Sequence, residues 1–160
     1  MNIDSYQTGQ LEHASYVLSA VAQDLIDKGQ ANWSLAQFTP EALAQELEPQ
    51  TLITAYFGQQ AVGAFVLTFH DPLVWAEIEP FASSFVHKLA VLPQYRGQGL
   101  AGEMLEYAAL QTLARGIHVT RLDCLANRPK LRAFYKSLGY TEVGLRQVET
   151  HRAALFEKRL

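Results

Sequence analysis

The segment from residue 84 to residue 125 constrains the fold most strongly, because it combines a strand, a glycine-rich turn, a helix and a second strand. Residues 84–92 are mostly apolar or β-branched and end at a proline, which favours a buried strand. Residues 99–115 carry apolar side chains at helical spacing, and residues 118–125 are strand-like again. Such a unit predicts two parallel strands joined by a crossover helix.

The rest of the chain predicts antiparallel neighbours for this unit. The expected strands cover residues 2–6, 51–57, 61–69, 140–143 and 152–158, and the expected helices cover residues 10–28, 40–48 and 129–138. The order β-α-α-β-β-β-α-β-α-β-β predicts one α+β domain over residues 1–160. We expect a mixed, mostly antiparallel central sheet of about seven strands with flanking helices.

Composition favours one soluble domain with a proper core, since 49% of the 160 residues are hydrophobic and 18% are charged. No apolar run is long enough to span a bilayer, and the first 30 residues lack a basic and apolar leader. We therefore expect a cytoplasmic protein without membrane contacts. The single cysteine, Cys124, excludes an internal disulfide, and five histidines without ligand spacing predict no metal.

Charge is distributed unevenly along the sequence. Residues 1–80 contain ten acids and one base, whereas residues 81–160 contain twelve bases and six acids. A basic half favours an anionic cofactor, and an acidic half favours a cationic substrate. Nucleic-acid binding is not expected, because the bases coincide with the motifs described below and the net charge is −3.

The turn that leads from the predicted strand 84–92 into the predicted helix 99–115 has the chemistry of a phosphate site. Its residues are Arg96-Gly97-Gln98-Gly99-Leu100-Ala101-Gly102. A helix N-terminus offers free backbone N–H groups and a partial positive charge. Glycine allows positive φ and close approach of a bulky anion, and Arg96 adds a permanent cation. We therefore predict that this turn binds a pyrophosphate.

Two cofactor families use such a turn. Residues 97–102 match the dinucleotide fingerprint G-x-G-x-x-G, and Asp123 lies where a ribose ligand is expected. Four residues separate the strand from Gly97, however, whereas the dinucleotide fold places its first glycine almost directly after the strand. The chain after Gly102 is also too short for a doubly wound sheet. We therefore reject the dinucleotide interpretation.

Four blocks together resemble the GNAT superfamily of N-acetyltransferases. They are Gln94-Tyr95-Arg96-Gly97-Gln98-Gly99, Val86-His87-Lys88-Leu89-Ala90-Val91, Leu122-Asp123-Cys124-Leu125-Ala126-Asn127, and residues 131–140, which end in Phe134-Tyr135-Lys136-Ser137-Leu138-Gly139-Tyr140. The first is similar to that family's Q/R-x-x-G-x-G/A signature. The likeness covers roughly residues 50–145, and the predicted element order fits the family over the whole chain.

The resemblance implies a site for acetyl-CoA. In that family the central strand carries a bulge and splays from its neighbour, so that pantetheine bonds to the strand's backbone. The expected cofactor-binding residues are Leu89, Ala90, Val91, Gln94, Arg96, Gly97, Gln98, Gly99, Leu100, Ala101, Gly102, Asn127, Arg132 and Tyr135. Asn127 matches a position that bonds the pantetheine arm. Arg132 or Lys130 is a candidate for the ribose 3′-phosphate.

The resemblance also implies catalytic roles. Tyr135 matches the family's usual proton donor to the departing thiolate. Several members carry a glutamate as base where this chain has Phe85, and His87 lies two residues along, on the same face of the strand. Glu77 and Glu79 are weaker candidates for the base. A nucleophilic Cys124 is not expected, because a lone cysteine in an apolar strand is usually a small buried hydrophobe.

The resulting hypothesis is an N-acetyltransferase. It would move an acetyl group from acetyl-CoA to a primary amine of a small molecule or peptide, by direct attack in a ternary complex. The alternative is a non-catalytic CoA- or acyl-CoA-binding module of the same fold, which the departure at Phe85 favours and the retained Tyr135 and Asn127 oppose. The closing strands can also pair between two copies, so a homodimer is a further expectation.

Overall fold

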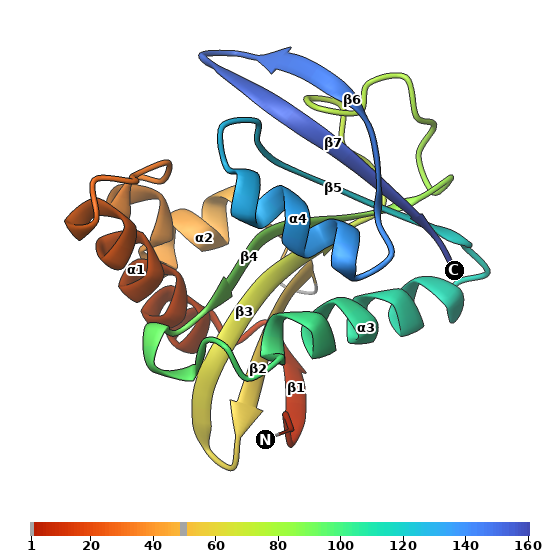
Figure 1. Cartoon of the computed structure of the whole chain (residues 1–160). Helices are drawn as coiled ribbons and strands as arrows, with labels where there is room; N and C mark the ends of the chain where they lie inside the picture. Colours follow the sequence, from red (N-terminus) through yellow and green to blue (C-terminus); the bar gives the residue numbers. More distant parts are fainter. Residues whose placement is uncertain (1, 49–50) are drawn as a thin grey trace. The chain divides into compact units, whose positions relative to one another are not determined.

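A computed structural model describes residues 2–48 and 51–160 (Figure 1). Its strands are β1 (Ser5–Thr8), β2 (Leu52–Phe57), β3 (Gln60–Thr68), β4 (Ser84–Val91), β5 (Val119–Leu125), β6 (Thr141–Val148) and β7 (His151–Arg159). Its α-helices are α1 (Leu11–Asp27), α2 (Pro40–Glu46), α3 (Leu100–Leu113) and α4 (Pro129–Ser137), with short 3-10 helices η1 (Leu35–Phe38) and η3 (Pro93–Tyr95). The chain forms two compact units, residues 1–67 with 88–105, and residues 68–87 with 106–160.

The helices form where the sequence signals place them. Thr39 caps α2 by accepting a hydrogen bond from the Ala42 N–H at 3.1 Å, and Pro40 occupies the first helical position. The buried face of α1 consists of small and branched apolar side chains, Ala14, Val17, Leu18, Val21 and Ala22. Among the helices of the described ranges, none has the length and apolar character needed to cross a bilayer.

The first unit is built on an antiparallel hairpin. β2 pairs with β3 and also with β1, both in antiparallel register, and β4 follows β3 in the sheet. The core of this unit joins α1 to the sheet through residues such as Phe38, Leu43, Leu52 and Tyr56. After β4, the Leu92 N–H donates to the Val62 carbonyl at 2.9 Å, which fixes the chain at the start of the glycine-rich turn.

The second unit contains the parallel step. β4 pairs with β5 in parallel, with Ser84 opposite Thr120 and Phe85 opposite Arg121, and β7 pairs antiparallel with both β5 and β6. β4 contributes residues 84–87 to this unit and residues 88–91 to the first unit. The strand order over the described residues is β1-β2-β3-β4-β5-β7-β6. The predicted α+β class is confirmed, because the described residues form a mostly antiparallel sheet of seven strands.

The main differences from the sequence prediction concern β1, η1 and β6, whereas the other elements shift by one or two residues at their ends. β1 covers Ser5–Thr8 rather than residues 2–6, and η1 occupies a stretch that we expected to be a loop. β6 continues to Val148, well beyond the predicted residue 143. β6 ends the sheet order, and its side chains alternate between exposed and half-buried. Its half-buried positions carry Glu142, Gly144 and Arg146, whereas the apolar Val143 and Leu145 are exposed, so the strand lacks a buried apolar face that the sequence could reveal.

Candidate functional site

The backbone of β4 is distorted in its middle. Lys88 has a φ of 53°, a left-handed conformation that non-glycine residues rarely adopt. This residue distorts β4, the strand in which the resemblance implies a bulge, and the strand continues to Val91. Leu89, Ala90 and Val91 follow it directly and are half-buried or buried. A strained backbone at the start of an expected binding segment is typical of functional sites.

The glycine-rich turn, residues 96–102, follows η3 and includes the N-terminus of α3. Gly97 and Gly99 have φ values of 75° and 85°, and an added Cβ at either residue would meet no atom within 4 Å. Glycine is therefore required here by backbone conformation and not by crowding. The first N–H groups of α3 have no carbonyl one turn earlier to bond. This exposed turn can therefore present donors and a positive helix end to an anion.

The Arg96 side chain is used within the first unit. Its Nη1 donates to Asp24 Oδ2 on α1 at 2.6 Å, and its Nε donates to the Val91 carbonyl at 3.2 Å. The hydrogen bond from Arg96 lowers the pKa of Asp24, and Lys28 adds to the effect. The Arg96 backbone N–H also donates to Pro93, at 3.3 Å. Arg96 therefore holds the turn in place, and residues 97–102 supply the candidate anion donors.

Tyr135 lies on α4 in the second unit with 6% of its surface exposed. Its ring packs against Phe156 and Tyr140, at centroid distances of 5.5 and 6.1 Å. Burial raises the pKa of the Tyr135 phenol well above its ordinary value. The hydroxyl therefore carries its proton at neutral pH, which is the state that a proton donor requires.

Asn127 and Arg132 line a pocket of about 540 Å³ in the second unit, at the end of β5. The other lining residues are Leu125, Ala126, Leu145, Thr150, His151 and Arg152. The structure thus brings together two of the predicted cofactor residues and adds a second arginine. The Arg132 guanidinium donates to the Ala126 carbonyl at 2.9 Å and pairs with Glu142, so its position is fixed. Lys130 is exposed.

The ion pairs of Glu142 predict a pH-dependent stability. The hydrogen bond from Arg132, followed by that from Lys136, lowers the pKa of Glu142 below the ordinary value of 4.5. Glu142 therefore stabilises the fold above that value, and the contribution disappears as the pH falls through the lowered pKa. We expect Glu142→Gln to cost about 1 kcal/mol at pH 7 and nothing at the acid end. Thermal unfolding of both proteins from pH 7 to pH 3 tests this, and an unchanged gap at low pH would contradict it.

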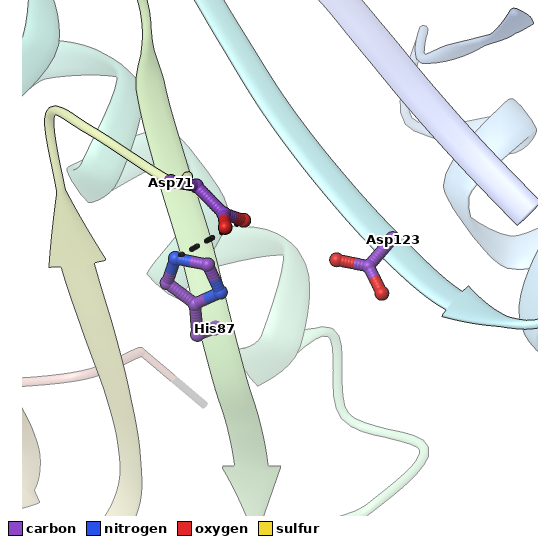
Figure 2. A group of neighbouring side chains, drawn as sticks. All are labelled: Asp71, His87 and Asp123. Atoms are coloured by element: carbon purple, nitrogen blue, oxygen red, sulfur yellow. Dashed lines mark ion pairs between the residues drawn. The ribbon is translucent and has the colours of Figure 1, made fainter. Parts of the chain in front are cut away.

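His87 lies in a group of polar side chains that come from three parts of the second unit (Figure 2). Its Nε2 is 3.0 Å from Thr68 Oγ1 and 4.0 Å from Asp71 Oδ2. Asp123, on β5, directs its carboxylate toward the other two residues. Burial, and next the Asp71 carboxylate, raises the pKa of Asp123 to about 6, while His151 acts in the opposite direction.

The structure gives less support to the other candidates for the base and for a nucleophile. Glu77 is paired with Arg146 through two hydrogen bonds of 2.7 and 2.8 Å, which lower the pKa of Glu77, and Glu79 is exposed in the same loop. Burial raises the pKa of the Cys124 thiol to about 11, so little nucleophilic thiolate is present near neutral pH. Phe85, at the position of the family's glutamate, is fully buried in the core.

Sequence reasoning missed the grouping of Asp71 and Asp123 with His87. The sequence places Asp123 at the ribose position of the rejected dinucleotide fold and within the block of residues 122–127, and it gives no signal for Asp71. No contiguous motif joins these residues, and the grouping of Asp123 with His87 follows from the register of the parallel pair in the structure. Because Phe85 lies opposite Arg121, two further residues along each strand place His87 level with Asp123 on one face.

Comparisons with known proteins agree on one family. The model of the acetyltransferase (GNAT) domain matches residues 48–142. The chain is similar to the uncharacterised N-acetyltransferase YesJ of Bacillus subtilis (strain 168), with 34% identity over 95 residues. That match covers 56% of this chain and 48% of YesJ, so it spans about half the length of the relative.

Solved structures share the fold. A GNAT-family acetyltransferase from Listeria monocytogenes 4b F2365 has a TM-score of 0.75 at 15% identity, covering 98% of this chain and 94% of that one. The PaiA N-acetyltransferase of Thermoplasma acidophilum, solved in complex with coenzyme A, has a TM-score of 0.72 at 14% identity, covering 98% of both chains. At such identities the likeness concerns the fold alone.

Proposed function

The chain belongs to the GNAT acetyltransferase family, and we propose that it transfers an acetyl group from acetyl-CoA to a primary amine of a small molecule or peptide. The observation that carries this proposal is the glycine-rich turn, where Gly97 and Gly99 adopt positive φ at the N-terminus of α3. The PaiA structure, which holds coenzyme A, supports the choice of cofactor.

The turn fits the pyrophosphate of acetyl-CoA, because it offers backbone donors, a positive helix end and open space beside both glycines. We assign the backbone of Leu89, Ala90 and Val91 to the pantetheine arm, with the Asn127 side chain as a further contact. The Arg132 guanidinium, in the pocket that Asn127 also lines, is the candidate for the 3′-phosphate. Gln94 precedes the turn and completes the assigned set.

We assign the two proton transfers of the reaction to two different side chains. Bound acetyl-CoA supplies an acetyl group that is already activated as a thioester. His87 accepts the proton that the amine must lose to attack directly in the ternary complex, and Tyr135 donates a proton to the departing sulfur. Backbone N–H groups of residues 89–91 stabilise negative charge on the carbonyl oxygen.

The role of His87 has a direct test. We expect His87→Gln to lower kcat by about 10²-fold, since a positioned base contributes at least about that much. The dissociation constant of acetyl-CoA should stay unchanged, because the assigned cofactor contacts do not include His87. Steady-state kinetics and calorimetry on the same preparations measure both values, and a kcat within about twofold of wild type would remove His87 as the base.

The activity as a whole is tested with the full chain. Thermal unfolding with and without acetyl-CoA measures binding, and thiol release over polyamines, aminoglycosides, amino acids and peptides measures transfer. We expect a stabilising shift together with thiol release for one class of primary amine. Binding without transfer to any amine would favour the non-catalytic CoA-binding module, and absence of binding would overturn the proposal.

A further inference from the structure

Three potential metal ligands converge in the second unit (Figure 2). One ligand atom each from Asp71, His87 and Asp123 lies within 4.8 Å of the other two. Asp71 belongs to the loop after β3, His87 to β4 and Asp123 to β5. The parallel pairing of β4 with β5 brings the last two level, so the group is a product of the fold and not of local sequence.

The Asp71 carboxylate is held in a fixed orientation. Its Oδ1 accepts hydrogen bonds from the backbone N–H groups of Leu73 and Val74, at 3.1 and 3.0 Å. These bonds leave Oδ2 directed at the group, where it is buried and has no hydrogen-bond partner among the described residues. The residue is 6% exposed. A buried carboxylate oxygen without a donor is costly, which points to a ligand that completes the site.

The two negative charges of this group favour the binding of a cation. Asp71 and Asp123 place two carboxylates in one partly buried space. Within the described ranges, Asp71 has one ion-pair contact, with His87 at 4.0 Å. No lysine or arginine pairs with either carboxylate in that part of the chain. A divalent ion would balance both negative charges while leaving the imidazole neutral.

We propose that Asp71, His87 and Asp123 form a binding site for a divalent first-row transition metal ion, with Zn²⁺ as the type case. Imidazole nitrogen combined with carboxylate oxygen suits this class of ion. The Thr68 hydroxyl, 3.0 Å from His87 Nε2, restricts the orientation of the imidazole ring. Bonds of about 2.0–2.2 Å require the three side chains to rotate inward, and water completes the coordination.

The site does not depend on acetyl transfer, but one consequence rests on the proposed function. A ring nitrogen bound to metal cannot take the proton of an amine. Occupancy by Zn²⁺ would therefore inhibit an enzyme whose base is His87. The sequence predicts no metal because its histidines lack ligand spacing. That criterion cannot detect a site made of one histidine and two distant aspartates.

Metal binding is measured on the tag-free full chain after treatment with a chelator. Calorimetric titration with Zn²⁺ should give one ion per chain, and Co²⁺ should develop visible absorption bands of a site with nitrogen and oxygen ligands. Asp71→Asn and Asp123→Asn should each weaken binding at least about tenfold. The asparagine carbonyl can still accept the Leu73 and Val74 N–H groups, so Asp71→Asn tests the metal and not the loop.

His118→Gln is the matched control, because His118 is an exposed histidine of the same unit. It should bind Zn²⁺ as the wild type does. Binding that is equal in Asp71→Asn, Asp123→Asn and wild type, or that falls only in His118→Gln, would overturn the site. No acetyl-CoA is present, so failure of this site and failure of the proposed acetyl transfer are separate results.

Discussion

Replacement of Tyr135 by phenylalanine is expected to lower kcat by about 10²-fold or more, while the dissociation constant of acetyl-CoA stays nearly unchanged. The substitution removes one hydroxyl and keeps the ring that packs against Phe156 and Tyr140. The phenol is protonated at working pH, since burial raises its pKa further above neutrality, and it can serve the departing thiolate. Steady-state kinetics with a responsive amine, together with calorimetry, measure the two quantities.

Tyr140→Phe provides a matched control. Tyr140 is also buried, and burial likewise raises the pKa of its phenol to about 12, but it stands at the end of the signature and not at the donor position. We expect its kcat to stay within about twofold of wild type, since general acid catalysis is assigned to the other hydroxyl. Equal losses in both variants would indicate a packing effect, and full activity of Tyr135→Phe would remove the acid role.

Replacement of Gly99 by alanine is expected to weaken acetyl-CoA binding by about 10- to 100-fold. Gly99 has a φ of 85°, which an alanine adopts only at a cost of about 1–2 kcal/mol, so the turn shifts away from its present shape. Loss of one charge-assisted hydrogen bond to a phosphate costs about 1.5–3 kcal/mol, which corresponds to that range of affinity. Calorimetry measures the dissociation constant, and thermal unfolding measures the change in stability.

Gly58→Ala separates the two effects. Gly58 belongs to the same unit, has a φ of 53°, and an added Cβ there also meets nothing within 4 Å. Both variants should lose similar stability, and Gly99→Ala alone should lose affinity. If the two bind acetyl-CoA equally well, the turn is not the pyrophosphate site.

Much of the fold was predictable because its signals are local. A capping Thr39, a proline at the first helical position and glycines at helix ends define elements within a few residues. The parallel step followed from the strand–helix–strand order of residues 84–125. The extent of β6 was not predictable in the same way, because its half-buried positions carry Glu142, Gly144 and Arg146 and its pairing with β7 is set by the sheet.

The candidate site was predictable only where a motif carries it. The glycine-rich turn and Tyr135 stand in contiguous signatures, whereas Asp123 meets His87 through the pairing of β4 with β5, and Asp71 reaches them from the loop after β3. The linear charge asymmetry also changes on folding. Pairs such as Arg96 with Asp24 and Arg146 with Glu77 join bases of the second half of the sequence to acids of the first. The side chain expected to face the cofactor, Arg96, is thereby tied to α1.

The most direct test of the central claim is a calorimetric titration of the wild-type chain with acetyl-CoA. The glycine-rich turn predicts one saturable site per chain, with a dissociation constant in the micromolar range, which corresponds to about −8 kcal/mol. Absence of saturable heat with acetyl-CoA at millimolar concentration would contradict the assignment of the turn and of the activity built on it.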